Sequence, residues 1–287
     1  MQILEKLNTI LMMKNKLYHE DFFKNQLEDS SIHAVITDPP YLIGYKDWDI
    51  QSLNFHERWL TECYRILKPG GTIWSSMAYC DKTGKVKIGD IFTGIMEDVG
   101  FDMDYRNSVV WARQKGRGAS KHLKSQREDI YFGTKPGGTP TWHPLKMLRE
   151  VVTPYMKDGR PRGWFLDENG KRVRWTGLGN VWTYTSPQYN SKSDRQIHPA
   201  QKPVMMLERL IRLSSNEGDW ILDPFMGSGS TGIATKLSNR QFIGFEKDDI
   251  NFSNAEKRAK EFNIENYKEF NNGIKQDMSL NKNNFFN

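Results

Sequence analysis

Short apolar runs alternate with amphipathic stretches along most of this chain, and each pattern predicts a different kind of element. The apolar runs predict strands at residues 16–19, 33–37, 72–77, 107–111, 130–133, 219–223 and 241–245. Helical spacing of apolar side chains predicts helices at residues 22–28, 53–67, 88–99, 204–214, 231–237 and 250–262. This alternation is typical of an α/β fold with a doubly wound, mostly parallel sheet.

The pattern breaks between residues 136 and 197. Pro136-Gly137-Gly138 predicts a loop, and the turn Asp167-Glu168-Asn169-Gly170 predicts a hairpin whose arms include Phe165 and Val173. We therefore expect a recognition insert within one α/β domain, followed by a flexible tail. The expected parts are the first half at 1–135, the insert at 136–197, the second half at 198–270 and the tail at 271–287.

Composition argues against several classes of protein. No apolar run approaches the roughly 20 residues that a membrane span needs, and the first residues are too charged for a secretory signal. The two cysteines, Cys63 and Cys80, have no metal-ligand spacing and indicate no disulfide framework. We expect a cytoplasmic protein with no bound metal.

Positive charge is concentrated in the middle of the chain. Residues 110–175 contain 15 Lys or Arg and 6 Asp or Glu, a net of +9, whereas the whole chain has +6. The remainder is therefore slightly acidic. A localised basic region is typical of proteins that bind a phosphate-bearing partner, although a solvated lysine-rich surface gives the same pattern.

A glycine-rich turn follows the predicted strand at 219–223. Gly227 and Gly229 allow the backbone to turn tightly and to approach a ligand closely. Glu246 ends the next predicted strand, where its carboxylate can accept hydrogen bonds from both hydroxyls of a ribose. With Asp223 before the turn, this pattern indicates a site for a nucleoside-bearing cofactor.

The segment Asp38-Pro39-Pro40-Tyr41 ends the predicted strand at 33–37. The Asp38 side chain and the Pro39 carbonyl can each accept one hydrogen bond from an amino group, and Tyr41 offers a flat face to a base. An aromatic amine is a poor nucleophile because its lone pair is delocalised. Two acceptors favour sp³ geometry at the nitrogen, which can then attack an activated methyl group in line.

With these motifs in this order, the sequence resembles the β-class amino-methyltransferases of DNA over about residues 15–265. The resemblance also includes Leu67-Lys68-Pro69-Gly70-Gly71 and His198-Pro199-Ala200-Gln201-Lys202-Pro203. It implies a Rossmann-like fold, S-adenosylmethionine as cofactor and double-stranded DNA as partner. It also implies that the strand before Asp38 and the cofactor strands are neighbours in the sheet. Many relatives dimerise, which leaves a homodimer open.

The resemblance assigns roles residue by residue. Its catalytic segment corresponds to Asp38, Pro39, Pro40 and Tyr41. Its cofactor-binding positions correspond to Asp21, Lys202, Asp223, Phe225, Gly227, Ser228, Gly229, Ser230, Thr231 and Glu246. Leu42 departs from the family, in which many members carry a polar residue there.

Basic residues in two segments are candidates for DNA contact. Residues 112–127 have few acids, and their glycines predict a mobile loop that becomes ordered on phosphates. The insert adds basic residues among tryptophans, some of which we expect to form a small core. The candidates are Arg113, Lys115, Arg117, Lys121, Lys124, Arg127, Arg172 and Arg174.

Asp rather than Ser at position 38 favours adenine N6 over cytosine N4 as the target, with the base flipped out of the duplex. Three other classes stay open. They are an amino-methyltransferase of RNA or protein, a nucleic-acid-binding protein with an inactive methyltransferase fold, and a dinucleotide-dependent oxidoreductase. The basic insert argues against RNA or protein as the substrate. The intact motifs argue against an inactive fold, and the incomplete glycine pattern argues against an oxidoreductase.

Overall fold

The computed structural model describes residues 15–41, 53–81, 83–117, 123, 125–152, 155–184, 186–187, 198, 200–263 and 267. The chain divides into two compact units. The larger comprises residues up to His143 together with Asn180–Phe262, and the second contains Pro144–Gly179.

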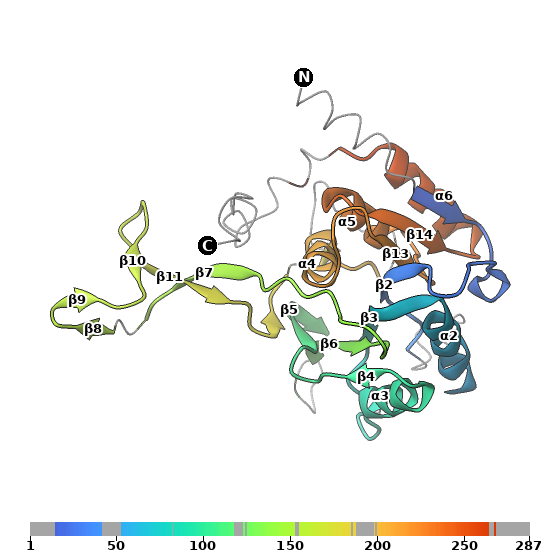
Figure 1. Ribbon diagram of the computed structural model, residues 1–287, viewed down its shortest axis with the longest axis horizontal. Coiled ribbons are helices and arrows are strands. Elements are labelled where there is room, and N and C mark those ends of the chain that lie inside the picture. The colour runs from blue at the N-terminus through green and yellow to red at the C-terminus, as the bar shows by residue number, and fades with distance from the viewer. Residues whose placement is uncertain are drawn as a thin grey trace. The chain divides into compact units, whose positions relative to one another are not determined.

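A nine-stranded sheet forms the centre of the larger unit, with the order β1-β14-β13-β2-β3-β6-β5-β12 and with β4 beside β6 (Figure 1). Its first five strands in this order are all parallel: β1 (Asn15–Tyr18), β14 (Gln241–Phe245), β13 (Trp220–Asp223), β2 (Ile32–Thr37) and β3 (Leu67–Met77). Antiparallel pairing then adds β6 (Ser125–Thr134), β5 (Val109–Arg117) and β4 (Asp102–Met103), and β12 (Val181–Trp182) lies parallel to β5. The α/β prediction and the adjacency of β2 and β13 are confirmed.

Helices cover both faces of this sheet. Successive strand residues point to opposite faces. Ile73 packs in the core cluster with Trp59 of α2 (Leu53–Ile66) and Phe92 of α3 (Ile88–Val99). The next residue, Trp74, donates a hydrogen bond from its indole nitrogen to Ser214 at the end of α4 (Val204–Ser214). The remaining helices, α5 (Ser230–Leu237) and α6 (Asp249–Lys260), follow β13 and β14.

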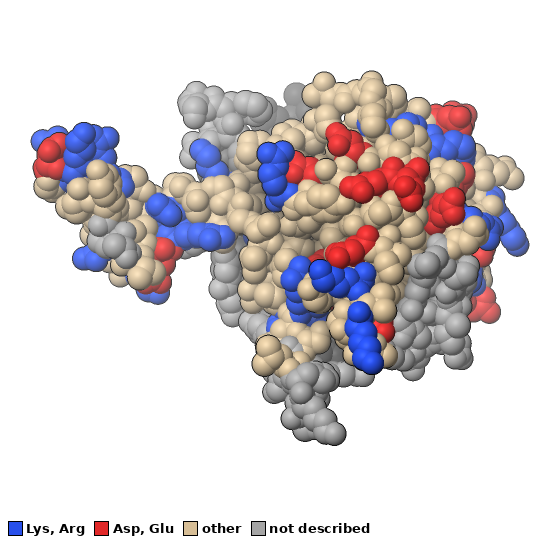
Figure 2. All heavy atoms as spheres, turned by 90° about the horizontal axis from the view of Figure 1, so that it is seen from below, with Lys and Arg blue, Asp and Glu red and all other residues tan. Residues whose placement is uncertain are grey.

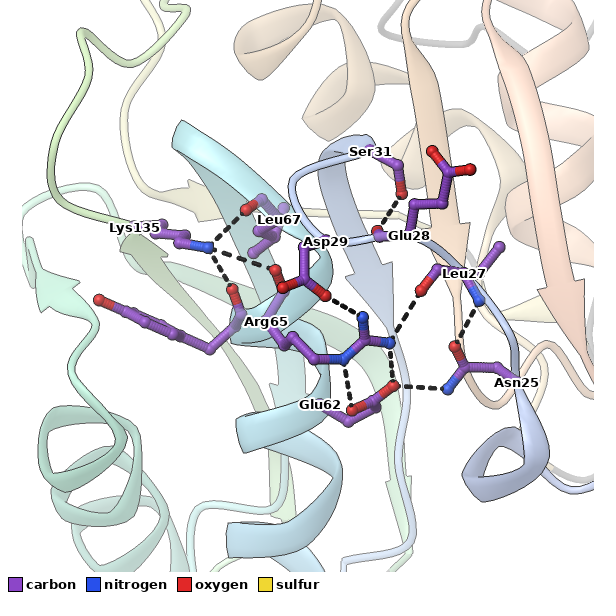
Figure 3. A network of polar contacts seen from close by, with 10 residues as sticks. Asn25, Leu27, Glu28, Asp29, Ser31, Glu62, Arg65, Leu67 and Lys135 are labelled. Atoms are coloured by element: carbon purple, nitrogen blue, oxygen red, sulfur yellow. Dashed lines mark hydrogen bonds and ion pairs between the residues drawn. The ribbon is translucent and has the colours of Figure 1, made fainter.

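The end of α2 is held by a charged side chain from a distant part of the chain (Figure 3). The Lys135 ammonium donates to the carbonyl oxygens of Tyr64, Arg65 and Leu67 at 2.7, 3.3 and 2.8 Å. The last carbonyls of a helix have no partner within the helix, and a cation at this end also complements the helix dipole. Lys135 thus fixes the junction between α2 and β3.

The predicted helix at 22–28 is wrong. Only Phe22–Lys24 forms a helical turn, the 3-10 helix η1. The Asn25 side chain donates to the Phe22 carbonyl at 2.9 Å and accepts from the Leu27 amide at 3.0 Å. These local bonds replace the backbone pairing that a longer helix would need.

The loop predicted at 112–127 is also wrong for residues 112–117 and 125–127, which form strands. Residues up to Arg117 continue β5, and β6 begins at Ser125, with Ala112 opposite Arg127 and Arg117 opposite Ser125. The polar, glycine-containing sequence suggested a loop, but antiparallel pairing satisfies its backbone.

The second unit contains a small sheet and a separate two-stranded hairpin. The sheet has the order β10 (Phe165–Leu166), β11 (Arg172–Gly177), β7 (Lys146–Glu150), and the hairpin pairs β8 (Met156–Lys157) with β9 (Arg160–Pro161). Phe165 lies opposite Val173, which confirms the predicted hairpin. The unit's internal segment, Pro144–Gly179, lies within the expected insert of 136–197. The expected tail at 271–287 lies outside the described residues.

Basic side chains outnumber acidic ones among the exposed residues of this second unit. Figure 2 shows one face of it, on which Lys and Arg are more frequent than Asp and Glu. The exposed basic residues on and beside its strands are Lys146, Arg149, Lys157, Arg160, Arg162, Lys171, Arg172 and Arg174.

Across the ranges given above, no helix is long and apolar enough to cross a membrane. Among the same residues, no group of three or more His, Cys, Asp or Glu side chains could hold a metal ion.

Candidate active site

Two motifs far apart in the sequence meet at the carboxyl edge of the parallel sheet. β2 and β13 are parallel neighbours, so the residues that follow them emerge side by side. The Thr37 hydroxyl donates to Asp223 Oδ1 at 2.8 Å, and the Thr231 hydroxyl donates to Asp223 Oδ2 at 2.6 Å. The amide of Phe225 donates to Asp223 Oδ1 at 3.1 Å. Asp223 therefore ties the end of β2 to the glycine-rich turn.

Burial dominates the electrostatics of Asp223. Its side chain is enclosed, and this burial raises its pKa to about 6, although the three hydrogen bonds act in the opposite direction. With both oxygens engaged inside the protein, its direct role is to hold the turn in place.

The glycine-rich turn requires its glycines. Gly227 and Gly229 have φ angles of 50° and 77°, in the left-handed region that other residues rarely adopt. A Cβ atom on Gly229 would lie 3.0 Å from the side chain of Ala255 on α6. The Met226 amide donates to the Phe245 carbonyl at 3.0 Å, which fixes the turn against the end of β14. The predicted tight turn is confirmed.

Glu246 lies directly beside this turn. Its carboxylate accepts a hydrogen bond from the Asp248 amide at 2.8 Å, and the Gly227 backbone also interacts with it. Burial raises the pKa of Glu246, and the backbone hydrogen bonds lower it only in part. A half-buried carboxylate next to a glycine turn has the chemistry needed to accept hydrogen bonds from a ribose, so these residues fit a nucleoside-bearing cofactor.

Asp21 lies at the same edge of the sheet. β1 is parallel to β14, and the Glu246 amide donates to the Tyr18 carbonyl at 3.1 Å. Asp21 follows β1 and accepts a hydrogen bond from the Phe23 amide at 3.0 Å, which caps η1. The cap orients its carboxylate three residues after the end of β1.

The serines of the turn have a different set of contacts. Arg258 of α6 donates to the Ser228 carbonyl at 2.8 Å, to the Ser228 hydroxyl at 3.2 Å and to the Ser230 hydroxyl at 3.1 Å. Both serines are buried. In this arrangement their hydroxyls anchor the turn to α6.

Asp38 lies in a cluster of buried and half-buried polar side chains, here called the Asp38 cluster: Asp38, Tyr41, Glu128 and Lys202. The Lys202 ammonium lies 2.6 Å from Asp38 Oδ2 and 2.8 Å from Glu128 Oε1. It also donates to the Tyr41 hydroxyl at 3.0 Å. That hydroxyl lies 2.5 Å from Asp38 Oδ1 and 3.0 Å from Glu128 Oε1. The sequence predicted Lys202 at the cofactor, whereas its ammonium lies between two carboxylates.

The groups of the Asp38 cluster shift one another's pKa values. Burial raises the pKa of Asp38, and the Lys202 cation opposes this without cancelling it. Burial acts in the same direction on Glu128, but the cations of Lys202 and Arg113 outweigh it and keep its pKa below the usual range. Burial would lower the pKa of Lys202, yet the two carboxylates raise it.

The residues predicted to contact DNA have different surroundings in the structure. Arg113 lies 3.6 Å from Glu128, and Arg127 donates to both oxygens of Asp129 at 2.7 and 3.0 Å. These two arginines already have acidic partners within the protein. On the second unit, Arg172 and Arg174 are exposed, and the Arg172 guanidinium lies 5.7 Å from the Trp164 ring centroid. Lys115 and Arg117 belong to β5, while Leu42, Lys121 and Lys124 lie outside the described residues.

The sequence reasoning missed Glu128 and Asp129. Both are buried on β6, with exposed fractions of 6% and 3%. A signal was present in the sequence, because the two acids stand together in a strongly basic stretch and directly precede the strand predicted at 130–133. Buried acids of this kind need charged or hydrogen-bonding partners.

Comparisons with known proteins bear on what this arrangement does. Residues 32–257 match a protein family described as DNA methylase. The chain is 35% identical over 228 residues to the Type II methyltransferase M.HpaI of Haemophilus parainfluenzae, covering 77% of this chain and 65% of M.HpaI. It is 30% identical over 241 residues to the DNA adenine methyltransferase YhdJ of Escherichia coli (strain K12), covering 75% of this chain and 72% of YhdJ.

A solved structure gives a likeness of fold. The chain superposes on the PvuII DNA methyltransferase (cytosine-N4-specific) with a TM-score of 0.61 and 17% sequence identity. The match covers 89% of this chain and 90% of that one. At this identity the likeness shows the fold alone.

Proposed function

The chain belongs to the DNA methylase family, and from this premise we propose that it methylates the N6 amino group of adenine in double-stranded DNA. S-adenosylmethionine is the methyl donor. One observation carries the proposal: Thr37 and Asp223 are joined by a hydrogen bond of 2.8 Å. This bond holds the acceptor residue Asp38 and the glycine-rich turn at one edge of the sheet.

The cofactor fits the second of these motifs. Gly227 and Gly229 permit close approach of the backbone, and Glu246 supplies acceptors for the ribose hydroxyls. To Asp21, which caps η1 three residues after β1, we assign the hydrogen bond from the adenine amino group of the cofactor. When bound, S-adenosylmethionine supplies an activated methyl group on a good leaving group.

The target amino group fits the first motif. Asp38 accepts one N–H of the flipped adenine, the Pro39 carbonyl accepts the other, and the ring of Tyr41 stacks on the base. With the donor held by the glycine-rich turn and Glu246, its methyl carbon would exchange the bond to sulfur for a bond to the N6 nitrogen, which Asp38 and the Pro39 carbonyl would orient. The nitrogen then releases one proton, and the Asp38 carboxylate is the acceptor nearest to it.

Asp at position 38 supports adenine as the target, and so does similarity to an adenine methyltransferase. Cytosine N4 is the second candidate, because the matching family comprises methyltransferases of both N6 and N4 amino groups. Both amino groups present two N–H donors to the same pair of acceptors.

Double-stranded DNA as the substrate is supported by the charge of the second unit. Exposed Arg172 and Arg174 lie on β11, and Arg160 and Arg162 lie at or just after β9. Basic side chains of this kind neutralise backbone phosphates, while aromatic and arginine side chains read base edges.

The experiment is methyl transfer from radiolabelled S-adenosylmethionine to duplex DNA, with duplex RNA of the same sequence as the control. Digestion to nucleosides and mass spectrometry then identify the methylated base. N6-methyladenine is the expected product. Detection of N4-methylcytosine instead would identify cytosine N4 as the target. Labelling of RNA alone would reject DNA as the substrate.

A further inference from the structure

Asp38 lies in a buried and nearly charge-balanced environment built by three separate segments. Asp38 follows β2, Glu128 lies on β6 and Lys202 directly precedes α4. The side chains of Lys202 and Glu128 are only 6% and 8% exposed. Lys202 contacts both carboxylates, at 2.6 and 2.8 Å.

Such a cluster is costly to bury unless every charge has a partner. Glu128 has a second cation, because Arg113 lies 3.6 Å from its other oxygen. Within the part of the chain that the structure describes, Asp38 is paired with one cation, Lys202, and its other oxygen accepts from the Tyr41 hydroxyl. Removal of Lys202 would therefore leave the carboxylates of Asp38 and Glu128 with only the Tyr41 hydroxyl between them. Repulsion between these two negative charges would favour protonation of Asp38.

Two further titratable groups act on this cluster from neighbouring segments. Asp223, at the end of β13, repels the Asp38 carboxylate. His198 is affected by the Lys202 cation, and its burial favours the neutral ring. Neither supplies a positive charge that could take the place of Lys202.

The proposed reaction makes two demands on Asp38 that this geometry meets. The carboxylate must be ionised before the base arrives, and it must exchange its present donor for the amino group of the base. Lys202 provides the first condition. Glu128 provides the second, because it still pairs with the ammonium when Asp38 turns to the base.

We propose that Lys202 and Glu128 are positioning residues: Lys202 keeps the free Asp38 carboxylate ionised, and Glu128 retains the ammonium when the target amine replaces it. This inference rests on the proposed function for its role in catalysis. The charge coupling itself belongs to the free enzyme and can be measured without turnover.

The test compares Lys202→Met, Glu128→Gln and the double variant with the unaltered chain. The direct measurement is the NMR titration of the Asp38 side-chain carboxyl carbon in the free protein. Lys202→Met should raise the titration midpoint of Asp38 by about one pH unit or more. Glu128→Gln should lower it, because a like charge is removed. The titration midpoint of Asp38 in the double variant should be closer to that of the unaltered chain than the midpoint in Lys202→Met is.

The kinetic measurement is the pH dependence of single-turnover methyl transfer. The acidic limb of the pH–rate profile should shift in the same direction as the Asp38 midpoint in each variant. Lys202→Met should therefore lose about tenfold more rate at low pH than on the plateau. Glu128→Gln should slow the plateau, since Lys202 then has only Asp38 as an ionised partner. Cofactor affinity, measured by calorimetry, should be unchanged in all three variants.

Three outcomes would overturn the inference: an unmoved Asp38 midpoint, a double variant no closer to the unaltered chain, or a loss of cofactor affinity without a change in midpoint. If Lys202→Met does not fold, the downward shift in Glu128→Gln decides alone. If the unaltered chain transfers no methyl group to nucleic acid, the proposed function fails, whereas the NMR titration still supports or rejects the coupling.

Discussion

The hydroxyl of Thr37 donates a hydrogen bond of 2.8 Å to the buried carboxylate of Asp223, although the two residues are 186 positions apart. Thr37 is the last residue of β2 and Asp223 is the last residue of β13. The bond therefore joins the segment that would bind the target amine to the segment that would bind the cofactor.

Replacement of this donor should weaken both folding and methyl transfer. Thr37→Val keeps the shape of the side chain but leaves Asp223 without one of its donors, which should lower the free energy of unfolding by about 1–3 kcal/mol. Urea denaturation measures this change. Thr235→Val is the matched control, because the Thr235 hydroxyl bonds only within α5, to the Thr231 carbonyl at 2.7 Å. Thr235→Val should retain full turnover. Equal loss of turnover in both variants would contradict a role for the Thr37–Asp223 hydrogen bond in methyl transfer.

Loss of the Asp38 carboxylate should abolish catalysis without loss of the cofactor. Asp38→Ala removes the acceptor for the amine and for its proton, so single-turnover transfer should fall by about 10²–10⁴-fold. Calorimetry should show unchanged affinity for S-adenosylmethionine. Asp98→Ala, at an exposed position on α3, is the control and should be fully active. Retained turnover in Asp38→Ala would reject the mechanism.

Glu246 should matter mainly for binding of the cofactor. Glu246→Ala removes the carboxylate beside Gly227, and the affinity for S-adenosylmethionine should fall by about 10–100-fold through loss of charge-assisted hydrogen bonds. The control is Glu261→Ala, an exposed acid directly after α6. Equal affinity in the two variants would remove Glu246 from the ribose site.

His56 should make the protein sensitive to acid. It is buried, accepts a hydrogen bond from the Trp59 indole at 3.0 Å, and burial lowers its pKa to about 4. The unfolded chain, with its ordinary pKa near 6.5, binds a proton where the folded chain does not. The contribution of His56 to the free energy of unfolding is therefore complete above pH 6.5, and about 3 kcal/mol is lost as the pH falls to about 4.

The test for His56 is urea denaturation from pH 7 to pH 4. His56→Gln should have a flatter pH dependence than the unaltered chain. The comparison is needed because Asp223, with its pKa raised to about 6, contributes in the opposite direction over an overlapping range. His143→Gln is the control. If the free energy of unfolding of His143→Gln depended on pH to the same extent as that of His56→Gln, the prediction would be contradicted.

The exposed arginines of β11 should contact DNA phosphates. Arg172→Ala with Arg174→Ala should weaken DNA binding and reduce the slope of log affinity against log salt by about 2. Fluorescence anisotropy across a salt series measures the slope. Arg106→Ala is the control, because this exposed arginine is paired with Asp104 on the larger unit. An unchanged slope in the double variant would place the DNA contacts elsewhere.

Local patterns were sufficient to predict most elements of the sheet and its helices. The apolar runs ending at Thr37, Asp223 and Phe245 are strands because their side chains suit a surface buried on both faces. Gly100, Gly227 and Gly229 adopt positive φ angles where the sequence predicted turns or a helix end. The predicted helix at 22–28 failed because the Asn25 side chain competes for the backbone, a local effect that apolar spacing does not register.

The sequence by itself determined the family, the mostly parallel sheet and the positions of the two motifs, since these depend on local spacing and on recognisable segments. Only the tertiary structure decided that Lys202 lies against Asp38 and Glu128, and that Arg113 and Arg127 have acidic partners. These pairings join residues from different strands and segments. A charged side chain chooses its partner by distance and burial in the folded chain, and neither quantity is encoded in the local pattern around it.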